Sequence, residues 1–457
     1  MLKKFRWSLL PAIIALAWPT MLEQLLHTAV QYIDTAMVGS LGTDATAAVG
    51  ATTTVNWLIG SSVSALGVGF LAVISQSLGA DNREHALRVS AQSVLVTLAV
   101  GIFFTAATLI LSPFIPAMMQ VDEAIRDIAA KYFFVLYTPM LFRSASIIFG
   151  AILRAAGDSK TPMVVGIIVN AVNVVLNFAF IYPTREISLG GISLTVYGAD
   201  MGVIGAAVAS AAAYTLGGII ITVALFRHKV ISPGKMQMRL DKEVLSPCLK
   251  IALPNMLQRF GTSLGYVFFA SMINSLGEIA TAAHTIANTV ESAFYIPGYG
   301  MQAAAATLTG NAHGAGDRQK IKDLARLLVL CEVLLMIISG GLLFVFAPAM
   351  MTVFSKDPEV IKLGSTVLKM VALSEPVYGV SIIIEGMLQG QGNTKTPFKF
   401  NIIGMWGIRI VGTFICTSFL GLGLVSAWGC MIAHNVLLFV MFTIYYNKKL
   451  TDRKLSS

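Results

Sequence analysis

The sequence predicts an all-α integral membrane protein in which twelve transmembrane helices form two pseudo-symmetric six-helix lobes. Hydrophobic residues make up 56% of the 457 residues and charged residues only 12%, whereas about 25% of the residues in a soluble domain are charged. The apolar residues gather in twelve long runs, and the sequence resembles itself at one constant offset. These observations predict a chain that crosses the membrane repeatedly and consists of two related halves.

Each apolar run is long enough to cross about 30 Å of hydrocarbon at a rise of about 1.5 Å per residue. The first run follows a basic N-terminus but continues unbroken to Val38. We therefore interpret it as an uncleaved span and not as a signal peptide. The predicted spans are residues 8–38, 45–78, 88–116, 127–152, 163–183, 201–226, 246–276, 281–312, 324–354, 359–388, 399–420 and 424–446.

The positions of the 32 Lys and Arg residues predict the orientation. Of these, 23 fall in the two tails and in alternate connections, five fall in the other connections and four lie inside spans. Cytoplasmic loops are enriched in Lys and Arg, so both termini are predicted to be cytoplasmic, which requires an even number of spans. We expect a multi-pass protein of a bacterial plasma membrane.

An offset of 235 residues aligns most of the first half with the second half. Ser40–Gly42 corresponds to Ser275–Gly277, and Lys160–Pro162 corresponds to Lys395–Pro397. Because each half contains six spans, an even number, both halves start on the same side of the membrane. The repeats are therefore related by an axis along the membrane normal. The register shifts after the fifth span, which makes the 184–200 connection an insertion. The predicted parts are an N-terminal lobe at 1–226, a cytoplasmic linker at 227–245, and a C-terminal lobe with a short cytoplasmic tail at 246–457.

The first span carries a polar stripe on one helical face. Its members are Thr20, Glu23, Gln24, His27, Gln31 and Asp34. An acid at bilayer depth costs about 3 kcal/mol or more unless it faces a cavity or is neutralised, so such a residue favours a functional interpretation. A structural hydrogen bond to a neighbouring helix is the alternative. Because Asp34 corresponds to Phe269 in the second half, ion coupling is predicted to be asymmetric.

Two later spans carry further candidates. Asn170, Asn173 and Asn177 share one face of the fifth span. Amides can donate to a carboxylate or accept from a carboxylic acid, as a proton site requires, although ordinary interhelical hydrogen bonds are equally consistent with the spacing. Glu291 lies deep in the eighth span before Pro297, where a proline kinks a helix and opens a pocket.

The other charged residues within spans are interpreted as members of ion pairs or as snorkelling side chains. These are Arg143, Arg259, Lys369, Arg409, Glu332, Glu375 and Glu385. The four cysteines have no paired spacing, so they predict neither a metal site nor a disulfide framework. Phosphate-loop, zinc-protease and nucleophile-elbow motifs are missing from the sequence. We therefore expect no enzymatic activity, no cofactor and no metal site. The net charge is +9, but most of the basic residues lie in connections and tails, so we expect no nucleic-acid partner.

Several segments together resemble the multidrug and toxic compound extrusion (MATE) family over essentially the whole chain. They are Trp18–Pro19, Ile33–Gly39, Gln76–Ala80, Leu153–Pro162, Ala282–His284, Thr309–Asn311 and Gly314–Asp317. The resemblance implies a two-lobe secondary active antiporter that exports organic cations or drugs in exchange for protons or sodium. It also implies that Asp34 is a coupling residue.

The sequence departs from the family pattern at two places. One branch supports the span-one acid with an Asn and an Asp on the fifth span, but here both places carry amides, Asn173 and Asn177. Another branch has an acid in the seventh span, where this chain has Thr262. The predicted ion-coupling residues are therefore Asp34, Asn173 and Asn177, and the choice between H⁺ and Na⁺ stays open. The predicted substrate-binding residues are Glu23, His27, Gln31 and Glu291.

A lipid-linked oligosaccharide flippase of related two-lobe architecture is the main alternative. A flippase needs a strongly cationic cleft for pyrophosphate, whereas the polar stripe here is acidic and rich in amides, which favours cationic cargo. A passive channel is disfavoured because no segment resembles a selectivity filter. The expected partners are small cationic substrates, H⁺ or Na⁺ and membrane lipid, and we expect the protein to act as a monomer.

Overall fold

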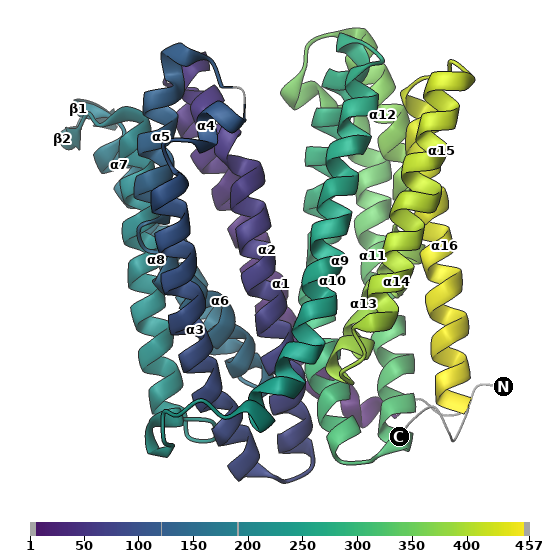
Figure 1. Ribbon diagram of the computed structural model, residues 1–457. Coiled ribbons are helices and arrows are strands. Elements are labelled where there is room, and N and C mark those ends of the chain that lie inside the picture. Colours follow the sequence, from purple (N-terminus) through teal and green to yellow (C-terminus); the bar gives the residue numbers. More distant parts are fainter. Residues whose placement is uncertain (1–5, 120, 190–191, 452–457) are drawn as a thin grey trace. The chain divides into compact units, whose positions relative to one another are not determined.

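The computed structural model of the protein describes residues 6–119, 121–189 and 192–451, and helices form most of this range (Figure 1). Four basic residues that contribute to the orientation prediction lie outside the described residues: Lys3, Lys4, Arg453 and Lys454.

The first half contains eight α-helices and a hairpin of two strands. They are α1 (Leu10–Gly39), α2 (Thr43–Gly79), α3 (Arg83–Leu111), α4 (Ile115–Met118), α5 (Glu123–Tyr137), α6 (Met140–Ala155), α7 (Lys160–Phe180), β1 (Pro183–Leu189), β2 (Ile192–Ala199) and α8 (Gly202–Arg227).

The second half contains eight α-helices and two segments of π-helix. They are α9 (Lys242–Asn274), α10 (Glu278–Gly314), α11 (Arg318–Phe354), α12 (Pro358–Ala372), α13 (Glu375–Gly390), α14 (Lys395–Ile402), the π-helix η3 (Ile403–Ile410), α15 (Val411–Phe414), the π-helix η4 (Ile415–Phe419) and α16 (Leu424–Thr451).

Twelve helical segments lie where the twelve spans are predicted. Within the described residues, eight segments are long and apolar enough to cross a membrane, the run Lys395–Phe419 counting as one of them. The pairs α5–α6 and α12–α13 add two spans, each bent at a short break. The remaining two are α9, with 33 residues, and α10, with 37 residues, whose apolar stretches are interrupted by polar side chains.

The backbone repeats with the same offset as the sequence. The two bent pairs turn by 49° and 53°, and their breaks at Thr138–Pro139 and Leu373–Ser374 are corresponding positions. Residues with positive φ also occur in corresponding pairs, such as Gly157 (85°) with Gly392 (78°). Since glycine adopts positive φ without steric cost, both halves use the same turn after their fourth span.

Contacts within the chain divide it into two compact units. Unit 1 contains the described residues of Met1–Gln24, Leu71–Asn82 and Pro247–Ser457, and unit 2 contains Leu25–Phe70 and Arg83–Ser246. The helices α1, α2 and α9 therefore each contribute to both units. The lobe boundaries predicted from the repeat, 1–226 and 246–457, stay a prediction.

Two apolar clusters form the interior of unit 1. One includes Leu324, Ile383 and Phe442 from α11, α13 and α16, and the other includes Phe269 and Trp428. Between membrane helices, such clusters stabilise the fold through close packing more than through removal of surface from water. This packing holds the polar side chains described below at fixed positions.

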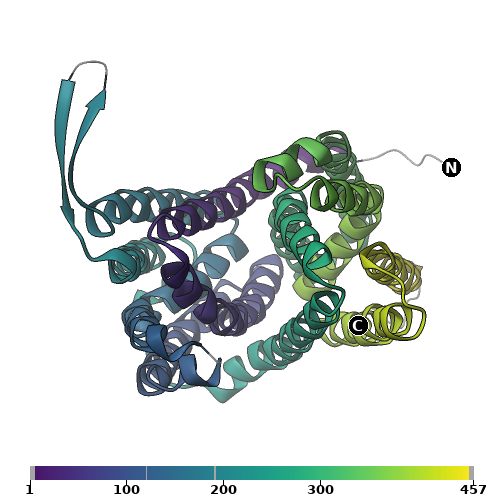
Figure 2. The same ribbon diagram turned by 90° about the horizontal axis from the view of Figure 1, so that it is seen from above.

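Two connections flank α8 in unit 2. The predicted insertion at 184–200 forms the antiparallel hairpin of β1 and β2, which projects away from α7 and α8 (Figure 2). The linker before α9 is held against α3: Arg88 pairs with Asp241 at 2.5 Å, and Gln92 donates to the Arg239 carbonyl at 2.7 Å. The hydrogen bond from Arg88 lowers the pKa of the Asp241 carboxyl.

Candidate functional site

Asp34 of α1 lies against the amide-bearing face of α7. Asn177 donates through Nδ2 to Asp34 Oδ1 at 2.5 Å. Asn173 lies one turn earlier, and with its nitrogen toward the acid it donates to Asp34 Oδ1 at 2.9 Å while its oxygen accepts from Ser210 Oγ at 3.0 Å. The predicted contact between the span-one acid and the fifth-span amides is therefore present.

The helical period explains this arrangement. Residues four apart share one face of a helix, so Asn173 and Asn177 point to the same side of α7, where they are 6% and 1% exposed. Asp34 itself is half-buried. Within the described residues, Asn177 Oδ1 has no hydrogen-bond partner. The site thus offers both donors for a carboxylate and a spare acceptor for a carboxylic acid or a cation.

A second polar group in unit 2 surrounds Arg143 of α6. Its Nη1 donates to Asn56 Oδ1 at 2.5 Å, and its guanidinium lies 5.0 Å from the centre of the Tyr214 ring. An ion pair or a snorkelling position was expected for Arg143, but the structure gives it an amide and an aromatic ring as partners. Arg143 also interacts electrostatically with His27, and the side chains of His27 and Gln31 are exposed.

Glu291 lies in α10 of unit 1 and is 6% exposed. Arg409 of the π-helix η3 is close enough to interact electrostatically with it. The Arg409 guanidinium lies 4.3 Å from the Phe269 ring centre and 4.7 Å from the Tyr266 ring centre. It also donates to Met431 Sδ at 2.7 Å. Arg409 is therefore buried among aromatic rings and does not snorkel, which corrects the interpretation from sequence.

Two acids of unit 1 are buried in a way that the sequence does not indicate. Glu332 of α11 and Glu375 of α13 are 0% and 1% exposed. Within the described residues, neither carboxyl oxygen of either side chain has a hydrogen-bond partner. Glu332 packs against Gly379 of α13, where an added Cβ would lie 3.1 Å from Oε1. The expectation of ion pairs or snorkelling is wrong for both acids, and buried ionisable groups of this kind favour a role in ion movement.

Glu385 of α13 is surrounded by amides from three helices. Its Oε1 accepts from Gln258 Nε2 at 2.8 Å and from Gln389 Nε2 at 3.0 Å. Its Oε2 accepts from Asn401 Nδ2 at 3.1 Å. Unit 1 therefore holds an acid with amide donors, similar in kind to Asp34 in unit 2. Sequence periodicity missed it because its partners lie up to 127 residues away.

The predicted residues are distributed between both units. Asp34, Asn173 and Asn177 form one contact group in unit 2, which also contains His27 and Gln31. Glu23 is half-buried on the part of α1 that belongs to unit 1, and Glu291 lies elsewhere in unit 1. Within the range that the structure describes, no three His, Cys, Asp or Glu side chains form a group that could hold a metal ion.

Comparison with known proteins agrees with this fold. The family model MatE matches residues 19–179 and 254–415, so the two matches start 235 residues apart, at the offset of the internal repeat. The probable multidrug resistance protein NorM of Thermotoga maritima is 28% identical over 421 residues, which cover 92% of this chain and 88% of that protein. The multidrug resistance protein MdtK of Yersinia pseudotuberculosis is 24% identical over 407 residues, covering 86% and 85%.

Solved structures share the same architecture. A MOP superfamily transporter from Pyrococcus furiosus matches with a TM-score of 0.88 and 22% identity, over 96% of this chain and 95% of that chain. An outward-facing MATE family multidrug resistance transporter matches with a TM-score of 0.87 and 23% identity, over 98% and 97%. The predicted fold, twelve transmembrane helices in two related six-helix halves, is thereby confirmed. Because the family model matches both halves, the chain belongs to the MatE family.

Proposed function

We propose that this protein is a secondary active antiporter, which exports organic cations or drugs in exchange for protons or sodium ions. Its relatives named as multidrug resistance proteins support export of small molecules. The observation that carries the coupling part of the proposal is the contact between Asp34 and Asn177, at 2.5 Å. An acid held by amides can change its bound cation without losing all of its partners.

The chemistry of exchange follows from this group. A deprotonated Asp34 accepts hydrogen bonds from the amides and attracts a cation. A protonated or sodium-bound Asp34 is neutral overall and releases that cation, and the Asn177 oxygen supplies an acceptor for the proton or the sodium ion. Competition between two cations for one negative region couples their affinities reciprocally. Export of one cation then requires entry of the other.

The charged side chains described above favour cationic cargo over pyrophosphate. Two basic side chains, the half-buried Arg143 and the buried Arg409, already face aromatic rings at 5.0 Å or less. Glu291 and Glu385 add negative groups in unit 1. A flippase for a lipid-linked pyrophosphate needs guanidinium or ammonium groups free to pair with phosphate oxygens. We therefore retain the organic-cation exporter as the proposed function.

Transport by everted membrane vesicles tests this function. A fluorescent organic cation is expected to enter vesicles that contain the protein when the lumen is made acidic or loaded with Na⁺, with both gradients varied independently. The gradient that drives uptake identifies the coupling ion, and vesicles without the protein are the control. Uptake that is indifferent to both gradients would contradict the antiport proposal.

Glu291 is proposed as a substrate-binding acid because it is buried beside Arg409 and precedes Pro297 in α10. The variant Glu291→Gln is expected to weaken binding of a monovalent cation by about tenfold or less, as for the loss of one partly compensated charge pair. Binding of an uncharged substrate is expected to change little. Equilibrium binding to purified protein measures both, and equal losses would indicate a structural acid.

The orientation, with both termini in the cytoplasm, is part of the proposal and rests on the positions of Lys and Arg. Ala315 lies after α10 and Lys356 lies after α11, and both are exposed. In a background with the four native cysteines replaced, Ala315→Cys is expected to react with an impermeant thiol reagent from the cytoplasmic side only. Lys356→Cys is expected to react from the outer side only. The reverse pattern of labelling would invert the topology.

A further inference from the structure

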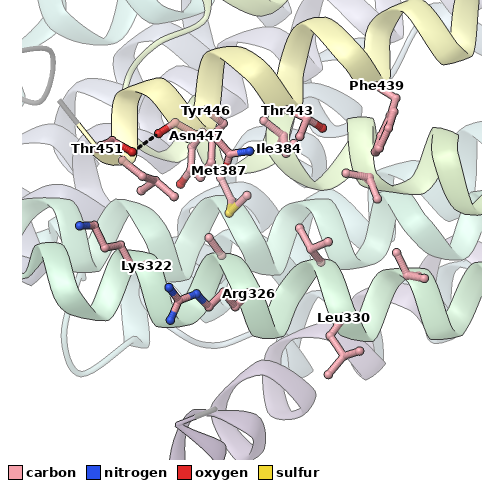
Figure 3. Close-up of a pocket in the computed structure, with 15 residues that line it drawn as sticks. Lys322, Arg326, Leu330, Ile384, Met387, Phe439, Thr443, Tyr446, Asn447 and Thr451 are labelled. Carbon is pink, nitrogen blue, oxygen red and sulfur yellow. Dashed lines mark hydrogen bonds between the residues drawn. The ribbon is translucent and has the colours of Figure 1, made fainter. Parts of the chain in front are cut away.

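A cavity of about 690 Å³ lies within unit 1 between α11, α13 and α16. Figure 3 shows that its lining changes along its length: Lys322, Arg326, Asn447 and Thr451 lie toward one end, and Leu330 and Phe439 lie toward the other. The start of α11 and the end of α16 meet at the polar end, which the predicted orientation places at the cytoplasmic side. The cavity is therefore polar at one end and apolar at the other, as one leaflet of a membrane is.

The polar end carries positive charge that the structure leaves available. Lys322 and Arg326 are four residues apart on α11, so they share one face of the helix. The Arg326 side chain is 48% exposed, and Asp323 lies 4.0 Å from it. Asp323 accepts a closer hydrogen bond from Gln319, at 2.9 Å. Asn447 and Thr451 of α16 face these basic groups across the cavity (Figure 3).

The other end of the cavity is lined by aliphatic and aromatic side chains. Val333, the last residue of α11 that lines the cavity, follows Lys322 by eleven residues, which is about 16 Å of helix at 1.5 Å per residue. That length is about half of a hydrocarbon core of roughly 30 Å. Val380, Ile384 and Phe439 continue the apolar lining on α13 and α16. A ligand that fills the cavity needs an anionic head and an apolar tail of about one leaflet.

We propose that this cavity binds an anionic phospholipid, with the phosphate at Lys322 and Arg326 and an acyl chain along α11, α13 and α16. Basic pockets between membrane helices are recognised by acidic head groups. A soluble anion would leave the apolar end empty, and an organic cation would meet two positive charges. A lipid bound there would brace α16 against α11 within unit 1.

Lipid binding to the purified full-length chain in detergent tests this assignment. Native mass spectrometry is used to compare palmitoyl-oleoyl phosphatidylglycerol with phosphatidylcholine of the same acyl chains. The wild type is expected to prefer phosphatidylglycerol by about tenfold, and the double variant Lys322→Gln, Arg326→Gln is expected to lose that preference. The matched control, Lys356→Gln with Lys362→Gln, removes two charges from the connection after α11 and from α12, outside the cavity lining, and is expected to keep that preference.

A second variant tests the apolar end independently of charge. Leu330→Trp fills the space for the acyl chain, so it is expected to reduce phosphatidylglycerol binding while the folded protein elutes normally from a sizing column. Glycerol 3-phosphate, the free head group, is expected not to compete at the same concentration. The proposal is overturned if phosphatidylcholine binds equally well to the wild type, if the double variant keeps the wild-type preference, if Leu330→Trp binds phosphatidylglycerol as well as the wild type does, or if glycerol 3-phosphate displaces the lipid.

Discussion

Replacing Asp34 by Asn is expected to abolish coupled efflux while leaving folded protein in the membrane. Asparagine has the size of the protonated acid but cannot exchange a proton or attract a cation, so the site is fixed in the neutral state of the protonated acid. The Asn177 amide, which donates to Asp34 at 2.5 Å, can still bond the new side chain. We expect uptake in everted vesicles to fall by at least about tenfold, within the usual range of coupling energies.

The matched control is Asp44→Asn, which removes an exposed acid from the first turn of α2 in the same unit. It is expected to transport at the wild-type rate. The variant Asp34→Glu keeps the charge and is expected to retain partial activity, which separates charge from shape. If Asp34→Asn still exports under an imposed gradient at the wild-type rate, Asp34 is a structural hydrogen-bonding group and the coupling acid must be sought elsewhere, at Glu23 or Glu291.

The contact of Asp34 with α7 was predictable because the polar residues of both helices recur with the helical period in the sequence. One acid ends the polar stripe of the first span, and amides recur on one face of the fifth. Helical period and the scarcity of acids in spans are sufficient to suggest such a pair. The structure supplies the contact, whereas the coupling role of Asp34, Asn173 and Asn177 stays a prediction.

The repeat was equally visible, and it extends to features that were not predicted. The aligned residues show two related halves, but they do not show that both fourth spans break at corresponding positions. The hairpin of β1 and β2 also fills an insertion whose presence, but not structure, follows from the alignment.

The surroundings of Glu332, Glu375 and Arg409 could not be predicted. The helical period of the sequence pattern shows on which face of its helix a residue lies. It does not show which neighbouring helix packs against that face, or which side chains of that helix are in contact. Arg409 lies between aromatic rings of α9, 140 or more residues earlier in the chain. Because a charged residue in a span usually finds a partner, ion pairs were expected, and for Glu332 and Glu375 that general expectation fails.

The crossing of α2 and α10 is where substitution is expected to affect stability most. A Cβ atom added at Gly79 would overlap the carbonyl oxygen of Asn311, and one added at Gly314 would overlap the carbonyl oxygen of Gln76. Gly79 and Gly314 are counterparts at the offset of 235 residues, and so are Gln76 and Asn311. The two contacts are therefore equivalent positions of the repeat, and glycine at each of them lets two backbones touch.

Gly314→Val is consequently expected to separate the two helices, because a backbone carbonyl cannot move aside as a side chain can. Overpacking usually costs about 1–3 kcal/mol, and we expect more than about 3 kcal/mol here, seen as a large fall in the melting temperature of the purified protein. Gly79→Val is expected to have a similar effect, because the two contacts are equivalent.

Gly341→Val in α11 is the matched control for these variants. Apart from the local backbone of its own helix, no atom of the described residues lies within 4 Å of the position of its Cβ, so it reports the effect of valine on a helix without a clash. It is expected to melt near the wild-type temperature. If Gly314→Val melts within a few degrees of Gly341→Val, the close contact of α2 with α10 does not limit stability and the crossing can open at little cost. Equal and large losses at Gly79 and Gly314 would instead mean that both of these equivalent backbone contacts limit stability.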